Sequence, residues 1–287
     1  MTLKNQKIAW ITDSTAMLSP EFIEKHSIHI IPLSIIFGEE CYLEGIEITA
    51  EDFYKKLSLS KTLPRTSQPA TGKFVELYEK LKEEYDYAIA IHASSVLTGT
   101  YQGSVLGAEM AGFENVRVID SKIGSYALGK MVERGIELEE QGYSYDDIVQ
   151  QLETLPNQGR LFLVPGSLEQ LQKGGRLSSS QVILGGLLRV KLIVKFEDGK
   201  VQLAEKIRSY NKVKARMFNI LEEKTDLVRE VGIVHGNDEE LANEWLTELR
   251  ERFPSIQFTS HILSPVAGTH LGQGTIGLSW IEKTSKK

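Results

Sequence analysis

Hydroxyl-bearing residues gather where an apolar run at residues 87–91 ends and a helix-like segment begins. The stretch SSVLTGT places Ser94, Ser95, Thr98 and Thr100 around one glycine. Related polar clusters occur as TDST at 12–15, TSQP at 66–69 and DS at 120–121. Hydroxyl and backbone N–H groups donate hydrogen bonds, and a helix N-terminus carries positive potential. Such junctions can therefore hold an anion.

Helix capping explains any single one of these residues more simply than ligand binding does, because Ser, Thr and Asp are common N-cap residues. Asp13 and Asp120 in particular are expected to have structural roles. Capping alone explains less well why the clusters follow several strands of one predicted sheet. In open parallel sheets, ligands bind beyond the carboxyl ends of the strands. The clusters therefore predict an anion site at that edge.

Two glycine-rich segments resemble nucleotide-binding motifs but lack their context. LQKGGRLSSS, at 171–180, is not a P-loop, because its lysine precedes the glycines. A helix C-terminus explains these glycines as well as a loop that presents Arg176 to a ligand. GQGTIG, at 272–277, has dinucleotide-fingerprint spacing, but it alternates like a strand and only ten residues follow it. His270, just upstream, remains a candidate partner for an acidic ligand.

Two catalytic alternatives stay open at this point. Ser94 or Ser95 could act as the nucleophile of a hydrolase acting on an acyl ester, with His270 as its base. No G-x-S-x-G elbow surrounds either serine. A metal-dependent phosphotransferase that uses Asp13 and Asp120 is a weaker alternative. Turnover of esters, or of ATP, by the isolated chain would distinguish them.

The composition is typical of a soluble globular protein. The 287 residues are 41% hydrophobic and 25% charged, and the formal net charge is −6, which argues against a nucleic-acid-binding surface. The single cysteine, Cys41, cannot form an internal disulfide and suits a reducing compartment. The apolar run at 8–11 is too short for a signal peptide or a membrane span. We therefore expect a cytoplasmic protein without a stable membrane anchor.

Strand-like and helix-like segments alternate in the first half of the chain. The strand-like segments are 7–11, 28–38, 87–91 and 116–120, and the helix-like segments are 19–27, 49–57, 71–85 and 97–112, with two further helices to about residue 156. This alternation favours parallel strands with helices on both faces. It predicts an N-terminal Rossmann-like α/β domain, residues 1–156, with three α/β/α layers.

The second half has a different pattern. Residues 191–208 predict a hairpin, because Asp198-Gly199 is a strong two-residue turn signal between two strand-like runs. Further strand-like segments occur at 160–165, 231–236, 256–263 and 274–282. A hairpin combined with later strands and helices predicts a C-terminal α+β domain, residues 157–287, with two layers and a mixed sheet.

Five motifs in order and in register make the chain resemble the DegV family. They are ITDST at 11–15, TSQP at 66–69, SSVLTGTYQG at 94–103, LQKGGR at 171–176 and GTHLGQGTIG at 268–277. The resemblance implies a two-domain bacterial protein that binds a long-chain fatty acid between or inside its domains. It also implies a partner, the ATP-binding catalytic subunit of fatty acid kinase, which converts the bound carboxylate to acyl-phosphate. The chain itself would be neither the catalyst nor the holder of a cofactor or metal.

The resemblance also implies a carboxylate site and a docking residue. Arg208 matches a basic position that the family uses at the kinase-docking surface. The residues expected around the fatty-acid carboxylate are Thr66, Ser67, Ser94, Ser95, Arg176 and His270. A cluster of neutral donors with few cations suits a head group with a single charge.

The sequence departs from the family pattern in two places. Leu271-Gly272-Gln273-Gly274 follows the histidine, where the family often has Thr-Gly-Pro-Gly, and Val190-Lys191-Leu192 stands where it often has Ile-Lys-Pro. A buried tail of a dozen methylenes would contribute on the order of 10 kcal/mol before ordering costs. The apolar runs 30–37 and 181–190 are candidate tunnel walls, although an ordinary core would explain them equally well.

Overall fold

The computed structural model describes residues 6–177 and 190–283. Its first sheet has four parallel strands in the order β2-β1-β6-β7. The strands are β1 (Ile8–Asp13), β2 (His29–Ile31), β6 (Tyr87–His92) and β7 (Val116–Asp120). The helices around it are α1 (Pro20–Lys25), α3 (Thr71–Leu81), α4 (Thr100–Ala111), α5 (Ser125–Glu140) and α6 (Tyr145–Leu152). The predicted parallel sheet is confirmed.

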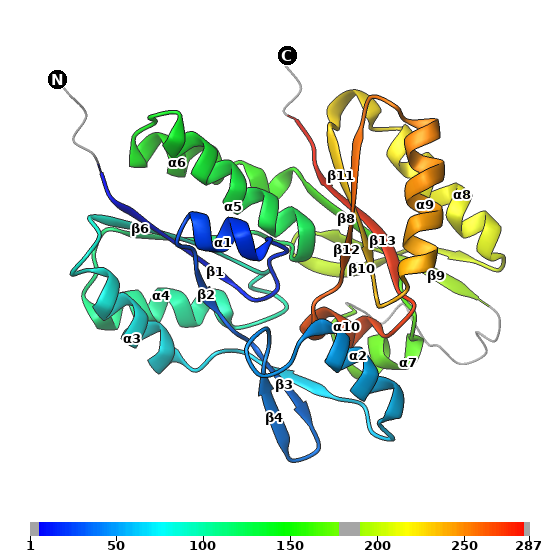
Figure 1. Cartoon of the computed structure of the whole chain (residues 1–287), viewed down its shortest axis with the longest axis horizontal. Coiled ribbons are helices and arrows are strands. Elements are labelled where there is room, and N and C mark those ends of the chain that lie inside the picture. Colours follow the sequence, from blue (N-terminus) through cyan, green and yellow to red (C-terminus); the bar gives the residue numbers. More distant parts are fainter. Residues whose placement is uncertain (1–5, 178–189, 284–287) are drawn as a thin grey trace.

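Helices cover both faces of this sheet, which gives three layers (Figure 1). On one face, Phe74 and Tyr78 of α3 pack with Ala108 of α4 against the small residues Ala88 and Ala90 of β6. Hydrophobic residues of α5 and α6 pack on the opposite face. Small side chains on a strand let a helix approach closely, so the alternating alanines of β6 help to set the spacing of these layers.

The second sheet has six strands in the order β10-β9-β8-β13-β11-β12 and is mixed. Its β11–β12 pair is parallel, whereas the other pairs are antiparallel. The strands are β8 (Gly159–Val164), β9 (Lys191–Glu197), β10 (Lys200–Ile207), β11 (Glu230–His235), β12 (Gln257–Ile262) and β13 (Ile276–Ile281). The helices α8 (Tyr210–Glu222) and α9 (Glu239–Arg252) pack on it around the buried Trp245. The predicted mixed sheet and the α/β fold class are confirmed.

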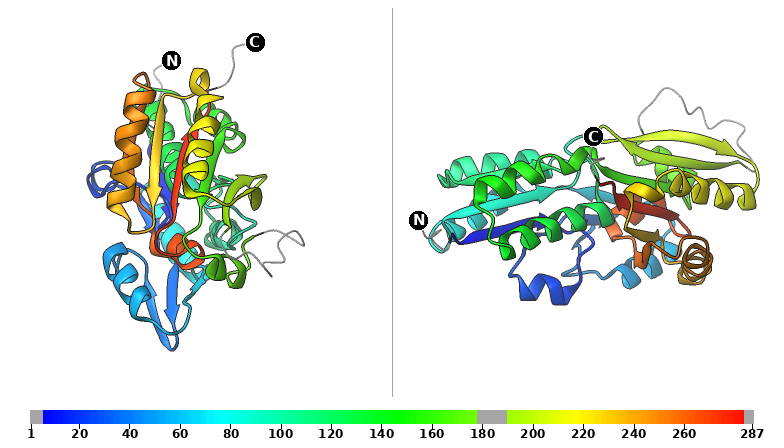
Figure 2. Two further views of the ribbon diagram at one scale, coloured as in Figure 1. Left: turned by 90° about the vertical axis from the view of Figure 1, so that its right-hand side faces the viewer. Right: turned by 90° about the horizontal axis from the view of Figure 1, so that it is seen from above.

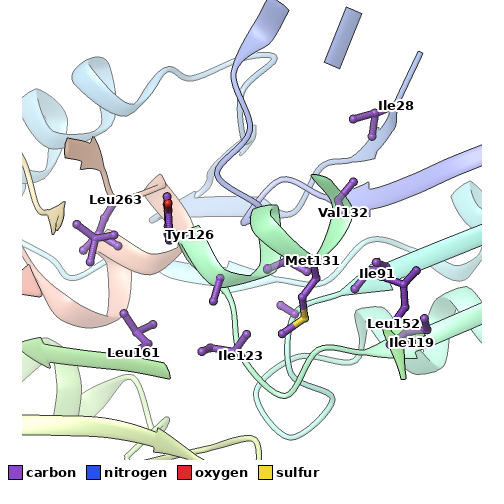
Figure 3. Close-up of a cluster of buried hydrophobic side chains, with 14 of the residues drawn as sticks. Ile28, Ile91, Ile119, Ile123, Tyr126, Met131, Val132, Leu152, Leu161 and Leu263 are labelled. Carbon is purple, nitrogen blue, oxygen red and sulfur yellow. The ribbon is translucent and has the colours of Figure 1, made fainter. Parts of the chain in front are cut away.

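Helix α5 connects the two sheets. It contacts β6 of the first sheet and β8, β11 and β13 of the second. Its buried Tyr126 and Met131 belong to one core that also contains Ile91 of the first sheet and Leu161 and Leu263 of the second half (Figure 3). Figure 2 shows the two sheets at either end of an elongated molecule. This shared core holds the two halves against each other.

We propose residue 156 as the boundary between the two domains, 1–156 and 157–287. It lies in the 3-10 turn η1 (Leu155–Asn157), and the second sheet begins directly afterwards at β8. A second 3-10 turn, η2 (Thr225–Leu227), joins α8 to β11. No helix within the described residues is both long enough and apolar enough to cross a membrane.

The segment 28–38 differs from its prediction as a single strand. It forms β2 in the first sheet and β3 (Ser34–Phe37) in a separate sheet, and Pro32 lies between them. Proline has no N–H group to donate, so it interrupts a strand ladder. The separate sheet has the order β4-β3-β5, with β4 (Glu40–Leu43) and β5 (Arg65–Ser67).

The three-stranded sheet positions part of the candidate site. It packs, together with α2 (Ala50–Leu59), against the short helix α10 (Pro265–Leu271) from the far end of the chain. Helix α7 (Leu168–Lys173) packs on α10 from another side. Three segments that are distant in sequence therefore meet at α10, the helix that contains His270.

Candidate functional site

A cavity of about 530 Å³ lies where the carboxyl ends of β6 and β7 meet the second sheet. This volume is within the range of about 300–1,000 Å³ that is usual for small-molecule sites. Its wall is mainly apolar, and both halves of the chain contribute to it. Apolar residues of the second half that line it are Leu161, Leu163, Leu171, Phe196, Val201, Leu263, Val266, Ala267 and Leu271. Such a cavity suits an apolar ligand.

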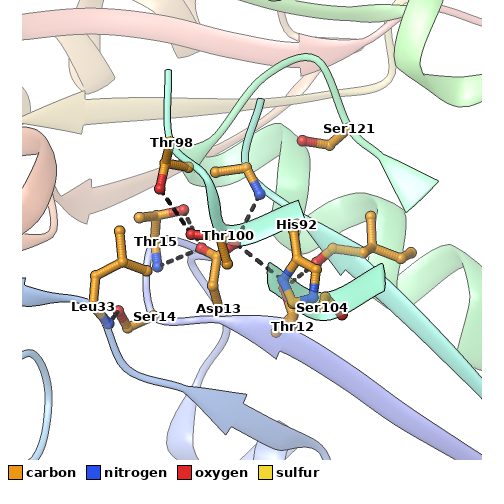
Figure 4. Close-up of polar contacts among 12 residues, drawn as sticks. Thr12, Asp13, Ser14, Thr15, Leu33, His92, Thr98, Thr100, Ser104 and Ser121 are labelled. Carbon is orange, nitrogen blue, oxygen red and sulfur yellow. Dashed lines mark hydrogen bonds and ion pairs between the residues drawn. The ribbon is translucent and has the colours of Figure 1, made fainter. Parts of the chain in front are cut away.

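The TDST cluster at the end of β1 forms a network of buried hydrogen bonds around Asp13 (Figure 4). Asp13 accepts hydrogen bonds from the backbone N–H of Ala93 at 2.7 Å and from the hydroxyl of Thr15 at 2.6 Å. His92 Nδ1 lies 3.3 Å from the same carboxylate. Burial raises the pKa of Asp13, but His92 and these donors outweigh it and leave the pKa lowered. Asp13 is therefore ionised, and its hydrogen bonds within the fold agree with the structural role expected from the sequence.

Ser95 lines the cavity, but its hydroxyl proton is already donated to another residue of the chain. Its hydroxyl donates to Asp120 Oδ2 at 2.5 Å, and its backbone N–H donates to Asp120 Oδ1 at 3.1 Å. A serine hydroxyl has one proton, so in this arrangement Ser95 can only accept a further hydrogen bond. A ligand carboxylate is also an acceptor. The predicted carboxylate contact of Ser95 would require its hydroxyl to leave Asp120.

Ser94 does not have the position that the family resemblance implied. It is completely buried and is not among the described residues that line the cavity. Its hydroxyl donates to the backbone carbonyl of Gly199 at 2.6 Å. Gly199 is in the two-residue turn between β9 and β10, where Asp198 and Gly199 both have positive φ, as the Asp-Gly signal predicted. Ser94 therefore attaches the hairpin of the second sheet to the end of β6.

Replacing Ser94 with alanine is expected to lower the free energy of unfolding by about 1–2 kcal/mol, because the buried Gly199 carbonyl loses its donor. Urea denaturation of Ser94→Ala measures this loss. Ser67→Ala is the matched control: its exposed hydroxyl donates only to the neighbouring carbonyl of Gln68, so a change below about 0.5 kcal/mol is expected. Equal midpoints for both variants would contradict the role given to Ser94.

Two helices begin at the cavity with no side-chain cap. Helix α4 has Gly99 at its N-cap and α5 has Gly124, and both glycines line the cavity. Helix N-termini leave backbone N–H groups unpaired and have positive potential. A Cβ at Gly99 would collide with the side chain of Gln68, so glycine permits this close approach. The helix ends favour a negatively charged group in the cavity.

Thr66 and His270 meet across 204 residues of sequence at one end of the cavity. Thr66 Oγ1 lies 2.9 Å from His270 Nε2. Burial, followed by the charge of Arg176, lowers the pKa of His270 to about 4, so the imidazole is neutral at physiological pH. His270 Nδ1 is buried and has no partner among the described residues.

The tautomer of His270 decides the direction of its hydrogen bond with Thr66. Nδ1 lacks a partner among the described residues in either tautomer, and a buried N–H donor without a partner is rarer in proteins than a buried acceptor without one. We therefore assign the proton to Nε2, which donates to Thr66 Oγ1. The hydroxyl proton of Thr66 is then available to a ligand that accepts hydrogen bonds. Thr66 thus becomes a donor that faces the cavity.

Arg176 supplies the positive charge of the cavity wall. It lies three residues after α7, which Gln170 attaches to α10 through hydrogen bonds to the carbonyls of Gly268 and Thr269. Its Nη1 donates to the carbonyl of Gly174 at 2.7 Å, and no ion pair joins it to a carboxylate among the described residues. Burial lowers its pKa, as expected for a cation without a counter-ion.

Five of the six residues expected around the carboxylate line the cavity. Thr66, Ser67, Ser95, Arg176 and His270 all line the cavity, with Ser67 exposed at its edge. Thr15, Gln68 and Thr98 belong to the predicted polar clusters and line the cavity, although they were not among the expected carboxylate contacts; Ser125, which lies outside these clusters, lines it as well. Thr98 Oγ1 lies 2.8 Å from Thr100 Oγ1. The signal for it was present, since a hydroxyl just before an uncapped helix favours an anion site.

Other expected residues lie elsewhere. Arg208 is exposed directly after β10 and is not among the described lining residues. Of the two apolar runs considered as tunnel walls, 30–37 contributes Leu33. The other, 181–190, lies outside the described residues except for Val190, which does not line the cavity.

The catalytic alternatives find no support in this geometry. The hydroxyl of Ser95 donates to Asp120, that of Ser94 donates to Gly199, and Thr66 is the hydrogen-bond partner of His270. No serine–histidine pair of a hydrolase is therefore assembled at these residues. Within residues 6–177 and 190–283, no group of three or more His, Cys, Asp or Glu residues could hold a metal ion.

Comparisons with known proteins match this architecture over nearly the whole chain. The family model "Uncharacterised protein, DegV family" matches residues 7–283. Protein DegV of Bacillus subtilis is 38% identical over 279 residues, which cover 96% of this chain and 99% of that protein. The crystal structure of DegV, a fatty acid binding protein from Bacillus subtilis, superposes with a TM-score of 0.88 and covers 97% of this chain and 100% of that one.

A second solved structure shares the fold at lower identity. The stearic acid-binding protein of Eubacterium ventriosum is 27% identical and has a TM-score of 0.88, covering 97% of this chain and 98% of that one. The family model and the 38% identity to the Bacillus protein agree with the five sequence motifs and the observed fold. On this evidence, the chain belongs to the DegV family.

Proposed function

We propose that this chain binds a long-chain fatty acid in the cavity and presents its carboxylate to a separate kinase subunit. The observation that carries this proposal is a mainly apolar cavity wall that contains one guanidinium, that of Arg176, with no carboxylate partner among the described residues. The family membership supports it, since two similar proteins are fatty-acid-binding proteins. The proposal makes the chain a binding subunit rather than a catalyst.

The carboxylate is proposed to lie at the end formed by Thr66, His270 and Arg176. Thr66 offers a hydroxyl proton, Arg176 offers charge-assisted N–H donors, and the uncapped N-terminus of α4 adds backbone donors near Thr98. The acyl chain would then lie against the leucines of β8 and the side chain of Phe196. A dozen methylenes buried there would contribute on the order of 10 kcal/mol before ordering costs.

The proposed contacts leave the carboxylate able to react. Neutral hydroxyls and one guanidinium hold the charge without consuming every lone pair of the two oxygens. In the proposed reaction, one carboxylate oxygen bonds to the γ-phosphorus of ATP, the bond from that phosphorus to the bridging oxygen breaks, and ADP leaves with the electron pair. Catalysis of such a transfer depends mainly on positioning and electrostatics. The partner subunit would bring ATP, and the exposed Arg208 remains our proposed contact to it.

A bound ligand carried through purification is the direct test. Native mass spectrometry of the full chain should show an added mass that disappears on denaturation, and the extracted lipid should be a fatty acid. The delipidated protein should then bind palmitate or oleate. A protein that purifies without lipid and binds neither acid would contradict the proposal, and saturable hydrolysis of an ester panel would favour the hydrolase instead.

A further inference from the structure

A second hollow of about 350 Å³ adjoins the main cavity. It is lined by Val96, Leu97, Gly175, Arg176 and Lys200, of which Val96, Leu97 and Arg176 also line the main cavity. We call this second hollow the vestibule. Arg176 therefore lies on the wall between the two spaces, and Lys200 belongs to the vestibule alone.

The fold places Arg176 and Lys200 side by side. Leu177 and Val201 form a parallel β-bridge, so the residues immediately before them, Arg176 and Lys200, are neighbours across the same pairing. Neighbouring positions on paired strands lie about 5 Å apart, and like charges at such positions repel each other. The hydrogen bond from Ser94 to Gly199 holds the hairpin turn directly before Lys200 at this place.

Neither cation is neutralised within the described chain. No ion pair involves Arg176 or Lys200 among the described residues, whereas Lys195 of the same hairpin has one. Glu197, which is opposite Lys200 across the hairpin, accepts instead from Lys195 at 2.7 Å. Two adjacent cations beside a cavity for an anionic ligand are stabilised when an anion lies between them.

We propose that the vestibule, lined by Arg176 and Lys200, is the subsite that recognises the phosphoryl group of the acyl-phosphate. This inference rests on the proposed function. Phosphorylation extends the head group outward by one phosphoryl group and increases its negative charge. Arg176 is within reach of both spaces, and Lys200 adds the second cation that the larger charge requires. Lys200 is thus a recognition residue for product and not for fatty acid.

The test compares two ligands with the same tail. One is palmitate, and the other is the stable 2-oxoalkylphosphonate in which CH2 replaces the bridging oxygen of palmitoyl phosphate. Their dissociation constants are measured by displacement of a fluorescent fatty acid from the delipidated full chain. Lys200→Gln should weaken phosphonate binding about five- to tenfold and leave palmitate within about twofold. Lys206→Gln, which removes an exposed lysine further along β10 that does not line the vestibule, should change neither constant beyond about twofold.

The outcomes separate this inference from the proposed function. If both ligands bind and Lys200→Gln weakens them equally or leaves both unchanged, the vestibule has no phosphoryl role while fatty-acid binding stands. If Lys206→Gln reproduces the selective loss, general surface charge explains the result and the inference fails. If the wild-type chain binds neither ligand, the proposed function and this inference fail together.

Discussion

Replacing Arg176 with glutamine is expected to weaken palmitate binding about 10- to 150-fold, because hydrogen bonds to charged groups contribute about 1.5–3 kcal/mol. Arg176 is half-buried and lines the cavity, and among the described residues no carboxylate forms an ion pair with it. Its charge is therefore compensated by the ligand when the ligand is a carboxylate. Isothermal titration of the delipidated chain measures the change in dissociation constant.

A matched ligand separates electrostatic recognition from damage to the fold. Hexadecanol has the same tail as palmitate but no charge, so Arg176→Gln should change its affinity by less than about threefold. Arg176→Lys should recover part of the palmitate affinity, because it restores the charge without the planar fork. Arg134→Gln serves as a surface control, since Arg134 pairs with Glu137 on the exposed side of α5. An equal loss for palmitate and hexadecanol would show that Arg176 supports the cavity wall rather than the head group.

The second large effect expected is a pH dependence of stability that depends on Glu44. This residue is only 3% exposed and connects three segments. It accepts hydrogen bonds from the hydroxyl of Ser14 and, at 2.7 Å, from the backbone N–H of Val266 at the start of α10. Burial raises its pKa to about 7, although these donors and Ser264 oppose the shift and the charge of Asp13 adds to it.

The sign of the effect follows from proton linkage. Between the ordinary pKa of 4.5 and about 7, Glu44 is protonated in the folded protein and ionised in the unfolded one. The unfolded state is then favoured increasingly as the pH rises through this range, by up to about 3 kcal/mol in total. Glu44→Gln removes this loss and keeps both contacts, because its amide oxygen accepts from Val266 and its amide nitrogen donates to Ser14.

Urea denaturation at several pH values between about 5 and 8 measures this effect. The free energy of unfolding of Glu44→Gln, relative to the wild type, should rise by about 2–3 kcal/mol across that range. His270 contributes in the opposite sense, since its lowered pKa destabilises the fold as the pH falls below about 6.5. Both proteins contain His270, so the difference between them isolates Glu44. Parallel stability curves would contradict the assignment.

The features that the sequence predicts well depend on residues close together in the chain. Alternation of strand and helix patterns was sufficient for the four-stranded parallel sheet. The Asp198-Gly199 turn was recognised because positive φ at both central positions is a local requirement. Pro32, by contrast, lies inside the apolar run 28–38, which predicts one strand. The break at Pro32 is recognised only from the pairing, because β2 pairs with β1 whereas β3 pairs with β5.

The hydroxyl cluster at 94–100 is only partly predictable from the local sequence. Four hydroxyls within seven residues predict a polar site, and that prediction needs no tertiary information. Their individual roles depend on acceptors elsewhere: Ser94 donates to Gly199, 105 residues away, and Ser95 to Asp120, 25 residues away. Each hydroxyl has one proton, so a distant partner that takes it also decides what the residue can offer a ligand.

The sequence by itself therefore determined the family, the types of the two larger sheets, and the residue types that favour an anion at the strand ends. Only the tertiary structure decided that Thr66 meets His270, that Arg176 faces the cavity without a carboxylate partner among the described residues, and that Lys200 stands beside it. The physical reason is that a motif specifies chemical groups, whereas charge compensation and the direction of each hydrogen bond depend on atoms that the folded chain brings from distant segments.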